Sequence, residues 1–279
     1  MATDNHIHVY RYENGISKQT ETGVVREAPI ALTVNNEAWL TFMCTPVKLE
    51  ALAIGFLYNE GVISSRAEVA EARVCEHGDN VDVWLTHEAA QPTHWKRTSG
   101  CTGGVTAVEQ VADGRWLMAD GRWQMADGGW QMADGRRQKV EYTPEQICRL
   151  SDMLLSSQKL YRETGGVHTS ALSDGEKILI AAEDIGRHNT LDKIAGRCLL
   201  ENIWPEERIL LTTGRISSEM LQKAARLGAA AVISRTAPSS LAVEMAESLG
   251  ITLIGYARRD RFNVYAHEER IVTSLEEHV

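Results

Sequence analysis

The sequence predicts an α/β protein with a C-terminal α/β sandwich and a smaller N-terminal α+β domain. In the C-terminal half, apolar segments alternate with segments of helical periodicity, which is typical of a largely parallel sheet covered on both faces. The N-terminal part carries strand-like segments around a single helix. At 279 residues the chain is longer than one ordinary core requires. We therefore predict an N-terminal domain over 1–110, an insertion over 111–140 and a C-terminal domain over 141–279.

The predicted N-terminal domain begins with strand-like segments. Residues 1–30 mix charged and polar side chains and are expected to form edge strands and turns. Two alternating segments follow at 30–34 and 39–43, and Asn35-Asn36 supplies the turn between them. A further strand is predicted at 81–85, ahead of a glycine-rich segment near residue 100.

One helix is predicted within this domain. Thr45 followed by Pro46 is typical of a helix start, with threonine as N-cap and proline at the first helical position. Gly61 is expected to end the helix. Its apolar face would consist of Leu49, Leu52, Ala53 and Phe56.

Residues 113–139 form a heptapeptide repeat. The unit Asp-Gly-Arg-Trp-Leu-Met-Ala at 113–119 recurs with small changes at 120–126 and 127–133. Each unit contains Asp-Gly, which breaks helices, so a coiled coil is not expected. We interpret the repeat as a duplicated, inert surface loop; the alternative is a contact ribbon that uses Trp116, Trp123 and Trp130.

The C-terminal domain shows a regular alternation of strands and helices. Thr143-Pro144-Glu145-Gln146 is a capping-box pattern that begins the first helix. Strands are predicted at 177–182, 208–213, 230–234 and 251–255. The helices between them are predicted through Leu191, Ile194 and Ala195, then over 217–227 and 238–249.

Composition and charge exclude several classes of protein. No apolar run approaches the roughly 20 residues of a membrane span, and the N-terminus lacks the pattern of an export signal. The expected location is therefore the cytoplasm. A net charge of −9 argues against a general nucleic-acid binder. The five cysteines include no CxxC pair, so neither a zinc ribbon nor an iron–sulfur cluster is expected, and free thiols are.

Cys101 stands apart from the other cysteines. Cys44 and Cys198 have apolar neighbours and are expected to be small buried residues. Cys101 lies among glycines in Thr98-Ser99-Gly100-Cys101-Thr102-Gly103-Gly104, with Lys96 and Arg97 just upstream. Nearby positive charge lowers a thiol pKa, and glycines leave a loop free to move. Cys101 is thus a candidate functional thiol that carries a group between two sites; the alternative is an inert cysteine.

Arginines follow four successive predicted strands. Arg187, Arg215, Arg235 and the cluster 258–261 come directly after them, where ligands bind in such sheets. Arginine forks pair bidentately with phosphate, so we predict a ligand that bears phosphate. The alternatives are solvated loop charges and, for Glu183-Asp184 with Arg187, a structural salt bridge. The fingerprints of P-loop nucleotidases, dinucleotide-binding dehydrogenases and serine hydrolases are absent from the sequence.

Several of these segments together resemble the FdhD/NarQ family, accessory sulfurtransferases of formate dehydrogenase. The resemblance covers nearly the whole chain except 113–139, and the segment 183–193 is its most specific part. The segments that carry it are Ala51–Leu57 with Glu60-Gly61, Ser99–Gly104, Thr164–His168, Glu183–Lys193, Ser217–Lys223, Leu241–Glu244 and Gly255–Tyr265.

The resemblance implies a sulfur carrier between a cysteine desulfurase and the molybdenum cofactor, bis-molybdopterin guanine dinucleotide, before that cofactor enters formate dehydrogenase. Cys101 matches the position of the family's cysteine persulfide. The cofactor-binding segment of the family matches Tyr256, Ala257, Arg258, Arg259, Asp260 and Arg261. Further candidates for this ligand are Arg187, His188, Arg215 and Arg235.

The resemblance also implies a homodimer and a C-terminal α/β/α domain similar to cytidine deaminase. The zinc-deaminase pattern is absent, so no metal site or deaminase activity is expected. Many family members carry a second cysteine three residues after the first, where this chain has Gly104. A relay between two thiols of this loop is therefore not expected.

Two other functions remain open from the sequence. One is a chaperone without catalysis, which binds and protects the guanine-dinucleotide cofactor through its arginines. The other is a nucleotide-modifying enzyme that uses His188 with Glu183. A structural histidine is the alternative for His188.

Overall fold

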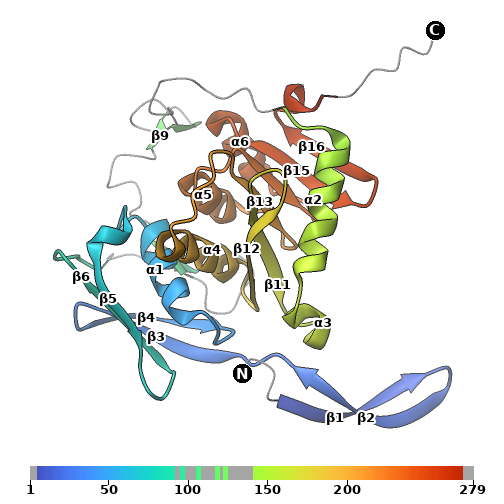
Figure 1. Ribbon diagram of the computed structural model, residues 1–279, viewed down its shortest axis with the longest axis horizontal. Coiled ribbons are helices and arrows are strands. Elements are labelled where there is room, and N and C mark those ends of the chain that lie inside the picture. Colours follow the sequence, from blue (N-terminus) through green and yellow to red (C-terminus); the bar gives the residue numbers. More distant parts are fainter. Residues whose placement is uncertain are drawn as a thin grey trace.

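The described residues form a small four-stranded sheet and a large six-stranded sheet, joined through a pair of packed helices (Figure 1). The computed structural model describes residues 5–91 and 141–272, together with the backbone of short strands at 95–97, 105–107, 117–119 and 122–124. The predicted α/β class is confirmed. Within the described ranges no helix is long and apolar enough to cross a membrane. The predicted division at 110 and 140 stays a prediction.

The small sheet has the strand order β4-β3-β6-β5. Its strands are β3 (Ala28–Val34), β4 (Glu37–Cys44), β5 (Val69–Val74) and β6 (Asn80–Leu85), which confirms the three strands predicted here. Alternate residues of β3 are buried, as the alternating sequence requires. They pack against α1 (Leu49–Asn59), where Phe56 meets Phe42 of β4 edge to face at 5.2 Å.

The predicted start of α1 is wrong. The helix begins at Leu49 rather than Pro46, and its N-cap is Lys48 in the left-handed conformation. Thr45 is instead fully buried and bonded to a distant corner. Its N–H donates to Asp184 Oδ2 at 3.1 Å, and its Oγ1 accepts the N–H of Ile185 at 3.2 Å. A threonine engaged by a distant loop cannot also cap its own helix. Gly61 follows the helix with φ of +80°, consistent with the predicted stop.

The large sheet has the strand order β12-β11-β13-β14-β15-β16. Its strands are β11 (His168–Ser173), β12 (Ile178–Asp184), β13 (Ile209–Thr212), β14 (Ala231–Ser234), β15 (Thr252–Arg258) and β16 (Arg261–Ala266). Neighbours β13, β14 and β15 run parallel, and the remaining pairs run antiparallel. The predicted parallel sheet is therefore right for its centre and wrong for its two sides.

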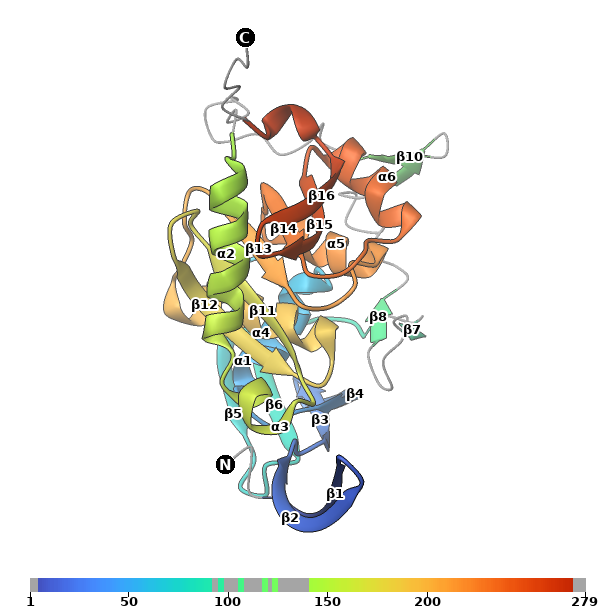
Figure 2. The same cartoon turned by 90° about the vertical axis from the view of Figure 1, so that its right-hand side faces the viewer.

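Helices cover both faces of this sheet, which gives three layers (Figure 2). On one face lie α4 (Arg187–Glu201), α5 (Ser218–Arg226) and α6 (Ser240–Leu249). On the other lies α2 (Pro144–Ser157), with the short α3 (Leu160–Thr164) after it. Thr143 caps α2 by accepting the N–H of Gln146 at 3.2 Å. The predicted N-cap is therefore right, but the capping box is not completed, and the side-chain amide of Gln146 instead donates to the carbonyl of Gly175 at 3.1 Å. Each face has its own apolar core.

Short hairpins lie outside the two sheets. The pair β1 (Asn5–Glu13) and β2 (Ile16–Val24) extends from the body as an arm (Figures 1 and 2), and Tyr10 on it is 77% exposed. Antiparallel pairing also joins β7 (Trp95–Arg97) to β8 (Val105–Ala107) and β9 (Leu117–Ala119) to β10 (Arg122–Gln124). The pair β9–β10 belongs to the heptapeptide repeat, and β10 lies beside α6. The rest of the repeat lies outside the described residues, so its role stays a prediction.

Two glycines allow α1 and α4 to cross in direct backbone contact. A Cβ added to Gly55 of α1 would lie 1.7 Å from the carbonyl oxygen of Asp192, and one added to Gly196 of α4 would lie 1.9 Å from that of Ala51. Neither helix can admit a side chain there without moving the other. The crossing holds the small sheet against the large one.

Buried charges surround this crossing. Lys223 of α5 reaches Asp192 Oδ1 at 2.6 Å and Glu60 Oε1 at 3.3 Å. Asn59, at the end of α1, donates to the same Asp192 oxygen at 2.7 Å. Buried ions of this kind require their partners, because an uncompensated charge in the interior is costly. The network therefore links α1, α4 and α5 in one arrangement.

The helix crossing predicts a strong effect of one methyl group. Gly196→Ala should lower the free energy of unfolding by about 2–4 kcal/mol, because the new Cβ overlaps the α1 backbone. Urea unfolding followed by circular dichroism measures this. Gly23→Ala is the control, since its Cβ would meet its nearest atom at 3.5 Å, an ordinary contact. Equal stability of the two variants would contradict the tight crossing.

Candidate functional site

The predicted ligand-binding positions converge at one edge of the large sheet. Pairing aligns His168 of β11 with Asp184 at the end of β12, and Ser170 with Thr212 at the end of β13. Thr212 is in turn level with Ser234 at the end of β14. Residues that follow these strands therefore share the edge, together with the β15–β16 turn. This is where an α/β sheet binds its ligands.

A buried ion pair shapes the first corner of this edge. Lys193 Nζ lies 2.5 Å from Asp184 Oδ2, and both side chains are fully enclosed. The other carboxylate oxygen of Asp184 accepts the N–H of Gly186 at 2.8 Å and the amide of Asn189 at 2.9 Å. Lys193 also donates to the carbonyl of Thr45 at 3.0 Å. The proposed salt-bridge corner exists, but Lys193 rather than Arg187 is the partner of Asp184.

Glu183 is committed to the opposite face of the sheet. Its carboxylate accepts the backbone N–H groups of Lys159, Leu160 and Tyr161 at 2.8–3.0 Å, and so fixes the start of α3. His188 packs on the other side, at the start of α4. The structure therefore does not form the pair of His188 and Glu183 that a nucleotide-modifying enzyme would use.

Arg187 and His168 pack over the loop that follows β13. A Cβ on Gly214 would lie 3.0 Å from Arg187 Cβ and 3.4 Å from His168 Nδ1, so the glycine makes room for both. Arg187 is buried at the first turn of α4. Burial, and then the charge of Arg187, lower the pKa of His168 below its usual range. Arg187 is therefore not a solvated loop charge, which is the alternative interpretation of these arginines. Arg215 is exposed, as that alternative would have it.

His188 follows Arg187 in α4 and is only 2% exposed. Its Nε2 is 3.5 Å from Ser217 Oγ and 3.9 Å from Glu219 Oε2. Burial, followed by the nearby charges of Lys223 and Arg187, lowers its pKa to about 2. The imidazole is therefore neutral at physiological pH.

Two arginines from neighbouring strand ends lie close together. Arg235 follows β14 and is half-buried; burial and then the charge of Arg258 lower the pKa of its guanidinium. Arg258 ends β15 opposite Arg261, the first residue of β16. Like charges held together repel each other unless an anion lies between them. Arg235 and Arg258 are thus suited to bind a phosphate group between them.

The end of β15 presents alternate residues to solvent and core, and the turn that follows it is exposed. Ala257 is buried, and its carbonyl accepts the hydroxyl of Ser151 on α2 at 2.9 Å. Tyr256 is 44% exposed and has φ of 52°, while Arg259 has φ of 48°. Left-handed backbone at such residues is strained and often marks a functional segment. Asp260, between Arg259 and Arg261, is exposed.

Three of the four described cysteines are poor nucleophiles. Cys44 and Cys198 are buried as predicted, and burial raises the pKa of each thiol to about 12. Burial and then Asp152 and Asp260 raise the pKa of Cys148. The thiol of Cys75 donates to Asp79 Oδ1 at 2.9 Å. Cys101 lies outside the described residues, in the segment that connects β7 to β8.

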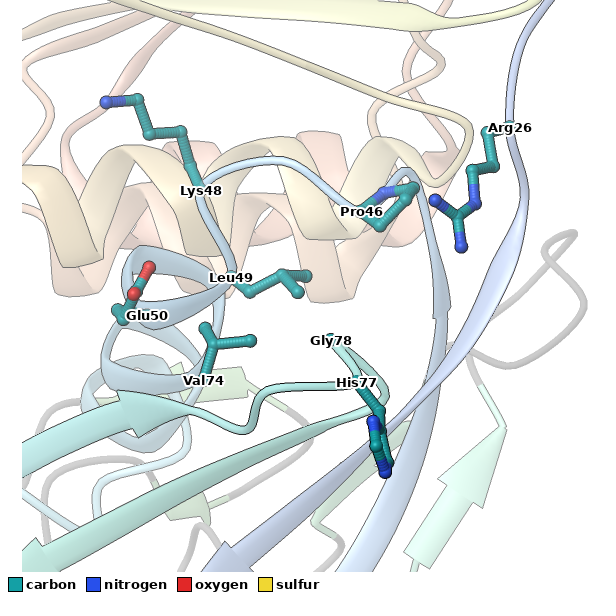
Figure 3. Close-up of a pocket in the computed structure, with 8 residues that line it drawn as sticks. All are labelled: Arg26, Pro46, Lys48, Leu49, Glu50, Val74, His77 and Gly78. Atoms are coloured by element: carbon teal, nitrogen blue, oxygen red, sulfur yellow. The ribbon is translucent and has the colours of Figure 1, made fainter. Parts of the chain in front are cut away.

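A surface cavity near α1 lies away from this edge. It has a volume of about 290 Å³ and is lined in part by Arg26, Lys48 and His77. In Figure 3 the side chains of Lys48 and His77 point in opposite directions, so these nitrogen-bearing side chains do not converge on one point. None of the predicted site residues lines this cavity.

Sequence reasoning missed the residues that support the edge. Thr45, Asp192, Lys193, Gly214 and Lys223 gained their meaning only from partners far along the chain. One signal was present: Asp192 and Lys193 are charged residues between the apolar Leu191 and Ile194. Charges inside an apolar helical segment indicate buried side chains that are each paired with an opposite charge elsewhere.

A family model and several relatives all match nearly the whole chain. The model of the FdhD/NarQ family matches residues 25–272. Proteins named Sulfur carrier protein FdhD from Bacillus licheniformis and Bacillus subtilis are 38% identical over 275 and 265 residues, covering 94% of this chain and 95% of each relative. The protein of that name from Staphylococcus aureus is 35% identical over 269 residues, covering 95% of this chain and 96% of the relative.

A solved structure is also similar. It is a protein from Desulfotalea psychrophila described as a formate dehydrogenase accessory protein, with a TM-score of 0.75 and 28% sequence identity. The match covers 96% of this chain and 99% of that one.

The buried imidazole predicts a pH dependence of stability. Folding lowers the pKa of His188 from 6.5 to about 2, so the unfolded state binds the extra proton. The contribution of the neutral His188 to the free energy of unfolding is complete above pH 6.5. It is lost as the pH falls from 6.5 toward 2, by about 1.4 kcal/mol per pH unit. Between pH 6 and pH 4 the free energy of unfolding should therefore fall more steeply for the native protein than for His188→Gln, by about 2–3 kcal/mol.

Urea unfolding at a series of pH values measures this difference. His6→Gln, at an exposed position on the β1–β2 arm, should follow the native protein. Parallel curves for the native protein and His188→Gln would show that the folded state does not exclude the proton.

Proposed function

Because the chain belongs to the FdhD/NarQ family, we propose that it is a sulfur carrier required for formate dehydrogenase activity. The observation that carries this proposal is the match, over nearly the whole chain, to relatives named Sulfur carrier protein FdhD. In this function the protein takes sulfur from a cysteine desulfurase as a persulfide on Cys101. It then transfers the sulfur to the molybdenum cofactor before formate dehydrogenase receives that cofactor.

The first step is a thiolate displacement. The Cys101 thiolate attacks the outer sulfur of the persulfide on the desulfurase, a new S–S bond forms on Cys101, and the desulfurase cysteine leaves as a thiolate. Delivery to molybdenum as sulfide consumes two electrons, which a thiol reductant can supply. The carrier itself needs one accessible thiol, so Gly104 in place of a second cysteine is compatible with this step.

The other cysteines support the choice of Cys101 by their surroundings. A reactive thiol is exposed and has a lowered pKa. Cys44 and Cys198 are buried with thiol pKa values of about 12, and the pKa of Cys148 is also raised. Cys101 has Lys96 and Arg97 upstream in the sequence. It is therefore the cysteine best suited to carry sulfur.

The strand edge supports binding of the cofactor as cargo. Burial and then the charge of Arg258 lower the pKa of Arg235, and a pyrophosphate between the two arginines would relieve that repulsion. Tyr256 presents an exposed ring beside them, suited to stack on a base. Arg187, Arg215, Arg259 and Arg261 add positive charge at the same edge. A bis-molybdopterin guanine dinucleotide carries both of the groups that these residues would bind.

Several further features of this function are proposed with it. The protein would act in the cytoplasm, as a homodimer, in contact with the desulfurase and with formate dehydrogenase. The similarity of its C-terminal domain to cytidine deaminase stays a prediction. The alternative function is a chaperone that binds and protects the cofactor through the same arginines without carrying sulfur.

The two functions differ in their need for Cys101. In cells that lack the native gene, Cys101→Ala should reduce formate dehydrogenase activity at least 100-fold, because no persulfide can form. Cys75→Ala is the matched control and should support normal activity. Full activity with Cys101→Ala would contradict the sulfur carrier and favour the chaperone.

The cargo site predicts a loss of nucleotide affinity. Arg258→Ala should weaken GDP binding about 10-fold or more, since one charge-assisted hydrogen bond contributes about 1.5–3 kcal/mol. Isothermal titration calorimetry measures the affinity. Arg149→Ala is the control, because that arginine bonds to Gly175 and Glu176 away from the edge. Equal affinities of the two variants would exclude Arg258 from the phosphate site.

A further inference from the structure

His188 has one ring nitrogen whose partner is missing. The side chain is 97% enclosed, and Nδ1 has no hydrogen-bond partner among the described residues. Nε2 faces Ser217 and Glu219 on the other side of the ring. Buried polar nitrogens almost always have a partner, so the orphaned Nδ1 requires an explanation.

The contacts of Nε2 are compatible with a proton on Nδ1. Ser217 is the N-cap of α5, and its oxygen accepts the N–H of Met220 at 3.5 Å. The hydroxyl proton can then be donated to His188 Nε2 at 3.5 Å, and the second lone pair of the oxygen equally allows the ring to donate. Glu219 Oε2, at 3.9 Å, is beyond hydrogen-bonding distance. When Nε2 accepts the hydroxyl proton in this way it is bare, and Nδ1 of the neutral ring then carries the proton.

A buried N–H without an acceptor is costly in the free protein, and its position favours an anion as the missing acceptor. His188 is the second residue of the 15-residue helix α4, whose N-cap is a glycine without a side-chain bond to the helix. Backbone dipoles make such an end positive. Lys223 and then Arg187 are the cations whose charges act most strongly on the ring. Lys223 and Asp184 are each already paired with a buried opposite charge, while Arg187 is the cation at this helix end.

We propose that His188 donates a hydrogen bond from Nδ1 to a phosphoryl oxygen of the ligand, which it positions at the N-terminus of α4. This inference rests on the proposed function, because the ligand is the phosphate-bearing cargo of the same strand edge. It adds a positioning residue on the α4 side of the edge, opposite the arginines of β14 and β15. His188 is neutral, so it contributes direction rather than charge.

The two nitrogens of histidine can be replaced one at a time. The side-chain amide of asparagine occupies nearly the position of Nδ1, and that of glutamine nearly the position of Nε2. His188→Asn keeps the proposed donor to the ligand and loses the bond to Ser217. His188→Gln keeps the bond to Ser217 and loses the donor. A purely structural histidine and a ligand-positioning histidine therefore predict opposite orders for the two variants.

Calorimetric titration of the full chain with GDP, pyrophosphate and guanosine tests the proposal. We expect His188→Asn to bind GDP and pyrophosphate within about 3-fold of the native protein. His188→Gln should bind both at least 10-fold more weakly. Guanosine has no phosphate, so its affinity should be equal in all three proteins. Thermal melting of each variant shows whether it is folded at the titration temperature.

The outcomes separate the inference from the function on which it rests. If the native protein binds GDP and His188→Gln binds it equally well, or better than His188→Asn, the inference is overturned and the cargo site stands. If the native protein binds neither GDP nor pyrophosphate, the phosphate site and the inference both fail. NMR of ¹⁵N-labelled histidine decides the tautomer without a ligand: a proton on Nδ1 supports the proposal, and a bare Nδ1 overturns it.

Discussion

The contact of α1 with α4 is the constraint on which the rest of the structure depends. Gly55 and Gly196 bring the two backbones together, and the charges of Asp192 and Lys223 are buried beside them. This crossing is the point where the small sheet meets the large one. Thr45, just before α1, completes the corner at Asp184 from which α4 begins. The position of Arg187 and His188 at the strand edge is therefore determined by residues far away in the sequence.

Local pattern was sufficient to predict most of the fold. The apolar segments at 209–212, 231–234 and 252–255 are strands because their side chains are buried on both faces. The strand β11 was missed because His168–Ser173 mixes polar residues with few apolar ones, and its serines and threonine are buried against hydroxyl and amide partners. Thr45-Pro46 has the pattern of a helix start, but a tertiary bond outweighs that local preference. Pattern cannot reveal a partner 139 residues away.

The site was predictable in its location and less so in its details. Arginines that follow successive strands must meet at one edge, because the strands share a direction, and Arg235 and Arg258 do meet there. The arginines of this edge differ in burial, since Arg187 is enclosed and Arg215 is exposed. The role of Glu183 could not be foreseen, because its partners are the backbone N–H groups of α3. Which carboxylates are free for chemistry depends on contacts that only the folded chain supplies.

A sulfur carrier needs an accessible thiol and a site that holds its cargo. Burial raises the thiol pKa of Cys44 and Cys198, and the strand edge offers positive charge, an exposed ring at Tyr256 and the start of α4. The most direct test is intact-protein mass spectrometry after incubation with a cysteine desulfurase and cysteine. We expect the mass of one added sulfur atom on the native protein and none on Cys101→Ser. No adduct on the native protein, with a desulfurase active on another acceptor, would contradict a persulfide carrier.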